Sequence, residues 1–183
     1  MRIIAGEAGG RKLFAPTGAD TRPTSDRTRG ALFNILGRRV AGAHVLDVFS
    51  GTGALALEAL SRGAERAVAI DSGREAVRAM ERNALAVLGE DWRKRLRILK
   101  MDYRQALPSL AGEQFDLIFL DPPYRMADAY AGALRFLENL TAPDARIVLE
   151  RAKTVQIPLP EGYRLLDSRA YGESALDFVA KGV

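Results

Sequence analysis

The sequence contains no cysteine and only one histidine, His44. The first absence excludes disulfide bonds and thiolate metal sites, and the second argues against a histidine-based metal centre or a serine-type catalytic triad. No run approaches the roughly 20 apolar residues that a membrane-spanning helix needs. The basic first residues also lack the apolar segment of a secretory signal peptide. We therefore expect a cytoplasmic protein that uses no metal.

Positive charge is concentrated at the start of the 183-residue chain. Residues 1–40 hold eight arginines or lysines against three acidic residues, a net charge of +5, whereas the whole chain carries +4. A basic front end on a near-neutral body is typical of a protein that meets a polyanion with one face. A solvated basic surface without any partner explains the same pattern equally well.

Apolar patterning predicts strands that alternate with helices. Two short apolar runs flank "GEAGG", which predicts a β-hairpin, and a helix with Thr24 or Ser25 as its N-cap follows. Further strands are expected at 44–50, 66–71, 95–102, 115–121 and 145–151, with helices at 52–63, 74–89, 103–110 and 127–140, and two final strands within 163–182. This order predicts an α/β fold with a mostly parallel seven-stranded sheet, an antiparallel edge strand and a small N-terminal hairpin.

A glycine-rich loop joins the first of these parallel strands to its helix. "DVFSGTGALA", residues 47–56, has the G-x-G-x-x-A spacing that lets a ligand approach the backbone at a helix N-terminus. The same glycines would also let a strand and a helix pack closely. Asp71 ends the next strand, where a carboxylate can accept both hydroxyls of a ribose. Asp102 ends the third strand and could accept a purine amine, although a single aspartate there could equally cap a helix.

The tetrapeptide "DPPY", residues 121–124, follows the fourth strand. Its two prolines fix the backbone and remove two donors, so the turn is stiff. The Asp121 carboxylate and the Pro122 carbonyl could grip the hydrogens of an exocyclic amine while Tyr124 stacks on the base. A proline stop after a strand would explain the prolines, but it would not explain the residues that flank them.

The choice of cofactor rests on the charges around the loop. "SGTG" contains no lysine or arginine to balance a pyrophosphate, whereas acidic strand ends suit a sulfonium cation. S-adenosylmethionine therefore fits better than a dinucleotide, and the predicted reaction is methyl transfer to an amine. An NAD-dependent oxidoreductase is the alternative from a different class, but it leaves Asp121 and Tyr124 without a role.

These motifs resemble those of the Rossmann-like class I amino-methyltransferases. More closely, "MRIIAGEAGGRKL", "RPTSDRTRGALFNIL" and "LDVFSGTGALALEALSRGA" are similar to the bacterial 16S ribosomal RNA guanine-966 N2-methyltransferase family. The resemblance implies methylation of a guanine N2 in 16S ribosomal RNA, within a 30S subunit or an assembly intermediate, with no DNA partner. Methylation of adenine N6 or of a protein glutamine stays open, because "DPPY" is shared by enzymes that act on those amines.

The charge and motif patterns together with the resemblance assign regions and residues. Residues 1–40 would face RNA, and residues 41–183 would form the methyltransferase domain. The candidate catalytic residues are Asp121, Pro122, Pro123 and Tyr124. The candidate cofactor-binding residues are Asp47, Ser50, Gly51, Thr52, Gly53, Asp71, Ser72, Asp102 and Tyr103, and for Tyr103 a packing role is as plausible. The candidate RNA-binding residues are Arg11, Lys12, Arg22, Thr24, Arg27 and Arg29. The family usually has a glutamate where Gly30 stands.

Overall fold

The computed structural model describes residues 1–15, 25–123, 126 and 128–182. Its strands are β1 (His44–Val48), β2 (Arg66–Asp71), β3 (Leu96–Lys100), β4 (Phe115–Leu120), β5 (Thr141–Ala152), β6 (Tyr163–Tyr171) and β7 (Ser174–Lys181). Its helices are α1 (Asp26–Leu36), α2 (Ala54–Ser61), α3 (Arg74–Leu88), α4 (Tyr103–Ser109) and α5 (Ala129–Leu137), with short 3-10 turns η1 (Gly37–Arg39) and η2 (Trp92–Lys94). None of these helices combines the length and the hydropathy needed to cross a bilayer.

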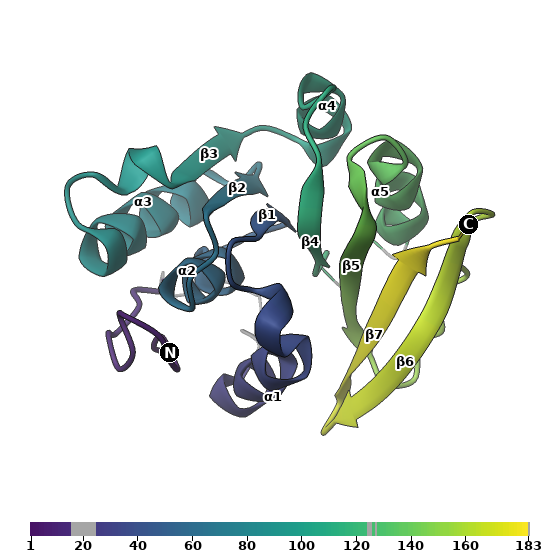
Figure 1. Ribbon diagram of the computed structural model, residues 1–183, viewed down its shortest axis with the longest axis horizontal. Helices are drawn as coiled ribbons and strands as arrows, with labels where there is room; N and C mark the ends of the chain where they lie inside the picture. The colour runs from purple at the N-terminus through teal and green to yellow at the C-terminus, as the bar shows by residue number, and fades with distance from the viewer. Residues whose placement is uncertain (16–24, 124–125, 127, 183) are drawn as a thin grey trace.

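The strands form one sheet in the order β3-β2-β1-β4-β5-β7-β6 (Figure 1). Strands β1 to β5 are parallel, so their carboxyl ends meet at one edge of the sheet. Strand β7 runs antiparallel to both of its neighbours. The predicted α/β fold is therefore confirmed, with one refinement. The reversed strand lies one place in from the edge, because the last strand of the chain pairs with β5 and leaves its hairpin partner β6 outermost.

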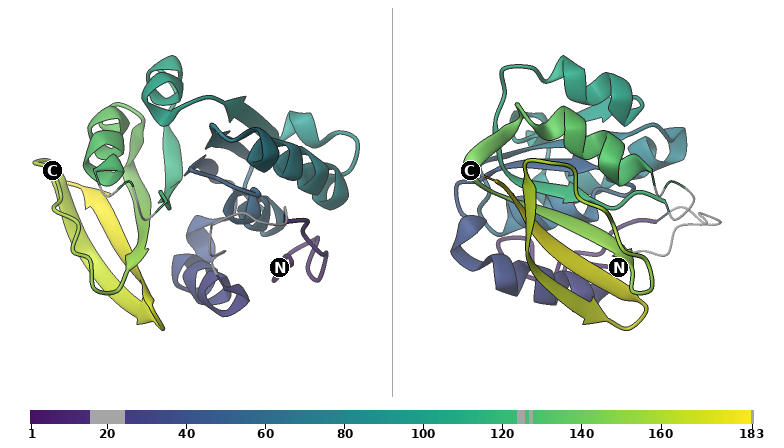
Figure 2. Two further views of the ribbon diagram at one scale, coloured as in Figure 1. Left: turned by 180° about the vertical axis from the view of Figure 1, so that it is seen from behind. Right: turned by 90° about the vertical axis from the view of Figure 1, so that its right-hand side faces the viewer.

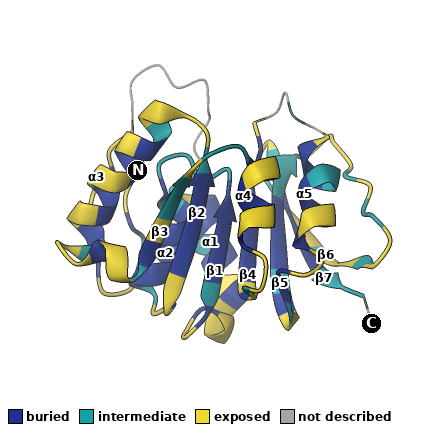
Figure 3. Ribbon diagram, turned by 90° about the horizontal axis from the view of Figure 1, so that it is seen from above, coloured by how far each residue is buried: buried dark blue, intermediate teal, exposed yellow. Residues whose placement is uncertain are grey.

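Helices cover both faces of the sheet (Figure 2). Along β4, Leu117 and Phe119 belong to a hydrophobic cluster shared with α1, α2 and α3, whereas Ile118 and Leu120 belong to a cluster shared with α4 and α5. This alternation follows from the two-residue period of a strand. We call the two sides the α1–α3 face and the α4–α5 face. Figure 3 shows the buried central strands between helices whose outer surfaces are exposed.

The predicted N-terminal hairpin is present, but a single β-bridge, between Arg2 and Lys12, joins its two arms. The hairpin is seated on the end of α2, where the Glu7 backbone N–H donates to the Ser61 carbonyl at 2.8 Å. Gly6 adopts a φ of +86°, and a Cβ atom there would lie 1.9 Å from the Ser61 carbonyl oxygen. Only glycine allows this close approach.

Helix α1 begins where the sequence predicted, because the Ser25 side chain accepts a hydrogen bond from the Thr28 backbone N–H. The apolar spacing of Leu32, Ile35, Leu36 and Val40 predicts that these four residues share the buried side of the helix, which is wrong for Ile35. Ile35 is 42% exposed, and Phe33 packs against the sheet instead, with its ring 5.8 Å from that of Phe119. At Gly30 an added Cβ would meet only an Ile4 methyl, at 3.7 Å, so the helix has room there for a side chain.

Candidate active site

The glycine loop adopts a strained conformation directly after β1. Phe49 has a φ of +69° and is the only non-glycine residue with a positive φ among those the structure describes. Gly51 and Gly53 follow with φ values of +56° and +79°. A non-glycine residue in this region costs on the order of 1 kcal/mol or more. Such strain concentrates where a backbone is shaped to hold a ligand.

Asp47 lies beneath this loop and organises it. The Ser50 hydroxyl donates to its carboxylate at 2.6 Å, and the Ala56 backbone N–H donates to the same oxygen at 3.2 Å. Burial raises the pKa of Asp47 to about 7, although the two hydrogen bonds oppose that rise. The side chain is 1% exposed, so its hydrogen bonds link the strand to the start of α2 from inside the protein.

Asp71 connects the glycine loop to the turn after β2. Its two carboxylate oxygens accept the backbone N–H groups of Gly51 at 2.8 Å and Gly73 at 2.7 Å. Burial raises its pKa, and these hydrogen bonds oppose the rise. Ser72, next in the chain, is exposed at the same sheet edge. Since a carboxylate offers about four lone-pair sites, Asp71 can also accept ligand hydroxyls.

The third strand end carries Asp102 and Tyr103. Asp102 is the N-cap of α4 and accepts the Arg104 backbone N–H at 2.9 Å, while its carboxylate remains 41% exposed. The capping and the ligand-binding interpretations of Asp102 are therefore compatible. Tyr103 is 4% exposed, and its ring lies 5.2 Å from that of Phe49. Tyr103 therefore packs against Phe49, at the start of the glycine loop.

Sequence reasoning missed Asn83 in α3, which is 1% exposed. Its amide nitrogen donates to the Thr52 carbonyl at 3.0 Å and to the Phe14 carbonyl at 2.9 Å, and its oxygen accepts the Phe14 N–H at 2.7 Å. It therefore ties the N-terminal hairpin to the glycine loop. A polar residue on the buried stripe of an amphipathic helix was the available signal.

The end of β4 places Asp121 beside the glycine loop. Val48 and Leu120 are in register between β1 and β4. Phe49, which follows β1, therefore lies beside Asp121, which follows β4. The Met126 backbone N–H donates to the Pro123 carbonyl at 2.8 Å. Pro122 is buried. Tyr124 lies outside the described residues.

Glu150 is a second carboxylate at this position, and sequence reasoning missed it. Leu120 and Leu149 are in register between β4 and β5, so Glu150 neighbours Asp121 on the α1–α3 face. The pKa of Asp121 is raised by burial first, and then by the charges of Glu150 and Asp47. The signal in the sequence was an acidic residue near the end of yet another predicted strand, in "ARIVLER".

The predicted RNA-binding residues comprise three exposed residues, two that lie outside the described part of the chain, and one that is buried. Arg11, Lys12 and Arg27 are exposed, and Arg11 also donates to the Ala86 carbonyl. Arg22 and Thr24 lie outside the described residues.

The prediction for Arg29 needs correction, because its side chain is completely buried. Its guanidinium donates to the Asp26 carboxylate at 3.0 Å and to the Arg2 carbonyl, and it lies 3.8 Å from the Glu58 carboxylate. It joins α1 to the hairpin and α2, so it is not placed to contact RNA.

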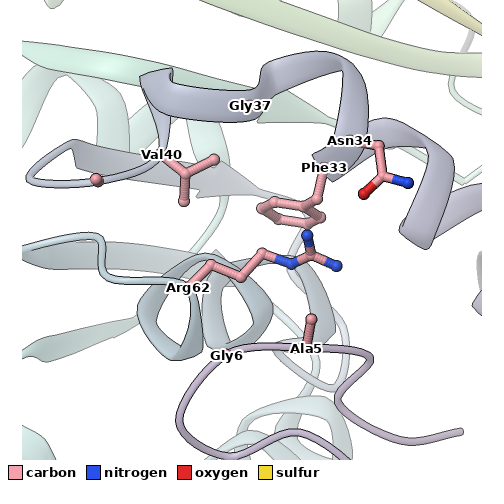
Figure 4. Close-up of a pocket in the computed structure, with 8 residues that line it drawn as sticks. Ala5, Gly6, Phe33, Asn34, Gly37, Val40 and Arg62 are labelled. Carbon is pink, nitrogen blue, oxygen red and sulfur yellow. The ribbon is translucent and has the colours of Figure 1, made fainter.

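A hollow between the hairpin and α1 lies elsewhere in the molecule (Figure 4). The Arg62 guanidinium stands 5.1 Å from the centroid of the Phe33 ring, and Gly37, Val40 and Ala41 complete one side. These last residues precede β1, so the hollow lies toward the amino ends of the strands. It is separate from the cluster of acidic strand ends.

Comparison with known proteins places this geometry in a family. Residues 1–180 match the sequence model of the family described as Conserved hypothetical protein 95. The chain belongs to this family. Bacillus subtilis "Putative rRNA methyltransferase YlbH" is 34% identical over 86% of this chain and 86% of its own length. Haemophilus influenzae "Ribosomal RNA small subunit methyltransferase D" is 33% identical over 94% of this chain and 89% of its own.

A solved relative confirms the fold over the full chain. The "Putative methyltransferase yhhF" from Escherichia coli superposes with a TM-score of 0.85 at 30% identity, covering 100% of this chain and 98% of its own. The family and the class I methyltransferase fold are thus as predicted. The residues also fit S-adenosylmethionine, because the loop is glycine-rich without a cation and adjacent strands end in Asp71 and Asp102.

The two loop glycines offer a matched test of the cofactor site. A Cβ at Gly53 would lie 2.7 Å from the Met80 Cγ in the core, whereas one at Gly51 would meet nothing within 4 Å. Both positions have positive φ. We expect Gly53→Ala to destabilise the protein by about 2–4 kcal/mol and Gly51→Ala by about 1–2 kcal/mol.

Chemical denaturation measures the two free energies of unfolding, and calorimetry with S-adenosylmethionine measures affinity. Equal destabilisation by both alanines would show that the contact with Met80 relaxes without cost. In that case only the backbone conformation of the loop would demand glycine.

Proposed function

We propose that this protein transfers a methyl group from S-adenosylmethionine to the exocyclic N2 amine of a guanine in 16S ribosomal RNA. The observation that carries the proposal is the position of Asp121 and Pro122 beside the glycine loop, fixed by the register of β1 and β4. A cofactor-type loop and an amine-binding turn thereby share one corner of the sheet. The cofactor is S-adenosylmethionine, as the fold and family indicate.

The chemistry asks two things of the chain, which must polarise the amine and take up its proton. When bound, S-adenosylmethionine supplies an electrophilic methyl group, whose bond to sulfur breaks as a bond to the guanine nitrogen forms. The Asp121 carboxylate and the Pro122 carbonyl would accept the amine hydrogens and draw the nitrogen lone pair out of conjugation. The proton that the nitrogen then loses would pass to Asp121, whose raised pKa suits it to hold one.

The RNA substrate is supported by the relatives and by charge. The names of both relatives described above refer to ribosomal RNA. Arg11, Lys12 and Arg27 expose cations at the hairpin and at α1, where phosphate contacts would orient the substrate. The target guanine must leave its stack to reach Asp121, at a cost of a few kcal/mol that such contacts would offset. A 30S subunit or an assembly intermediate is the expected setting.

Product analysis tests the proposal. Purified protein, radiolabelled S-adenosylmethionine and either 16S RNA or 30S particles that lack the modification should yield N2-methylguanosine on nucleoside digestion. N6-methyladenosine as the labelled nucleoside would refute the guanine assignment and keep the reaction class. Label in protein glutamine alone, or binding of NAD without binding of S-adenosylmethionine, would refute the proposal altogether.

A further inference from the structure

Two arginines lie on either side of a small residue on the α1–α3 face of the sheet. Ile147 of β5 pairs with Val179 of β7, which places Arg146 level with Ala180. Arg164 of β6 pairs with Ala180 from the other side. Neighbouring strands are about 4.8 Å apart, so the two arginine Cα atoms lie roughly 10 Å apart across a methyl side chain. The side chains of Arg146, Ala180 and Arg164 lie on the same face of the sheet as those of Val148 and Phe178.

A third arginine joins them from η1. The Arg39 guanidinium donates to the Asp144 carbonyl at 3.0 Å, which holds it beside the amino-terminal half of β5. The pKa of Arg146 is lowered by partial burial, and next by the charges of Arg39 and Arg164, while Asp144 opposes the shift. The guanidinium groups of Arg39 and Arg164, from two other elements, therefore lie within electrostatic reach of Arg146. We call Arg39, Arg146 and Arg164 the arginine cradle.

We propose that the arginine cradle binds backbone phosphates of the RNA strand beside the target nucleotide. The inference rests on the proposed function and adds a second contact surface to it. Like charges gathered over a small side chain repel one another, and a polyanion relieves that repulsion. Guanidinium groups also match phosphate geometry by donating two hydrogen bonds at once.

The location of the cradle suits this role. Arg146 and Glu150 lie on the same face of β5, four residues apart, so about 13 Å separates the cradle from the acidic corner that contains Asp121. A single strand of RNA covers such a distance in a few nucleotides. The N-terminal hairpin lies on the opposite flank of α1 from β5, β7 and β6 (Figure 1). RNA bound by both surfaces would be held on two sides of α1.

Charge neutralisation with a matched control tests the cradle. The test variant is Arg146→Gln with Arg164→Gln, and the control is Arg78→Gln with Arg135→Gln, which removes the same charge from exposed positions on α3 and α5. Filter binding to a 16S RNA fragment at several salt concentrations, without cofactor, measures affinity. We expect the test variant to bind at least about 10-fold more weakly. For this variant, the slope of log K against log salt concentration should be shallower by about 1.4, because two phosphate contacts to single-stranded RNA are lost.

Kinetics and stability complete the test. The test variant should raise KM for RNA and leave kcat, S-adenosylmethionine affinity and Tm unchanged, whereas the control should change RNA binding less than about twofold. If Arg146→Gln prevents folding, the exposed Arg164→Gln alone should lower the salt slope by about half as much.

Three results separate the possible failures. Equal weakening by test and control variants would overturn the cradle, because net charge alone would explain the effect. Normal RNA binding with lost activity on 30S particles would also overturn it and would indicate an acidic protein contact. A wild-type protein that methylates no RNA would instead refute the proposed function.

Discussion

Replacement of Asp121 by asparagine is expected to lower the rate of methyl transfer to RNA by about 100-fold or more. Asparagine keeps one acceptor oxygen but cannot take up the proton that the amine must lose, and proton transfer by a positioned side chain contributes about 10²–10⁴-fold. A single-turnover assay at saturating cofactor and RNA measures the chemical step. Binding of S-adenosylmethionine should be retained, since the glycine loop and Asp71 are untouched.

The stability of this variant supplies an internal check. In the wild-type protein the Asp121 charge is desolvated and repelled by Glu150 and Asp47, so the neutral amide should leave Tm unchanged or raise it. Asp116→Asn is the matched control, because Asp116 lies at the other end of β4, exposed, where it accepts the His44 backbone N–H at 2.8 Å. Full activity of Asp121→Asn together with full activity of the control would remove Asp121 from the mechanism.

The pH dependence of the same pair of proteins follows from the raised pKa of Asp121. The carboxylate is the form that accepts hydrogens, so the wild-type rate should rise as pH rises through that pKa and then level off. Asp121→Asn should lack this rise. Stability moves the other way, because the folded state holds the proton more tightly than the unfolded chain. Wild-type stability is therefore lost as pH rises from the ordinary aspartate value through the raised one, and the stability advantage of the asparagine variant should grow.

Much of this corner of the molecule could be predicted from sequence, because its signals are local. Glycine spacing after a strand, aspartates at strand ends and the stiff proline turn are each visible within a few residues. Parallel strands then bring those ends to one edge whatever their order. Glu150 was missed because its importance depends on β5 lying beside β4, a pairing between residues 29 apart in the chain.

Arg29 shows what local sequence signals cannot reveal. In the sequence it is one cation among several in a basic segment, and nothing local distinguishes it from exposed Arg27. In the fold it is buried beside Glu58, which also lies in the core, on a different helix. The arginine cradle is equally non-local, since Arg146 and Arg164 become neighbours only through Ala180 of the last strand. Charge counting therefore finds a basic segment but cannot tell which of its charges reach solvent.

Replacement of Glu58 by alanine is expected to destabilise the folded protein by about 3–5 kcal/mol, the usual cost of removing one partner from a buried ion pair. The Glu58 carboxylate is completely buried and accepts three donors: the Ile4 backbone N–H at 2.7 Å, the Ala5 backbone N–H at 3.1 Å and the Arg62 side chain at 2.7 Å. Its loss would remove the buried carboxylate that lies 3.8 Å from the Arg29 guanidinium and would leave the Ile4 and Ala5 N–H groups without their acceptor. For a chain of this size, the Tm should fall by about 10 °C.

The hairpin should respond more strongly than the rest of the fold, which separates this effect from general loss of stability. Backbone N–H groups of Ile4 and Ala5 should exchange with solvent much faster in Glu58→Ala, while those of β1 and β4 should follow only the global change. Glu113→Ala is the control, since it breaks an ion pair of 2.6 Å with Arg97 at the surface, where such pairs contribute about 0–1 kcal/mol. If Glu58→Ala cost no more than this control, the hairpin would be held by its apolar contacts and by its hydrogen bonds to Ser61, Asn83 and Arg29. The hairpin cations that we propose to contact RNA would then owe their position to these other contacts rather than to the buried carboxylate.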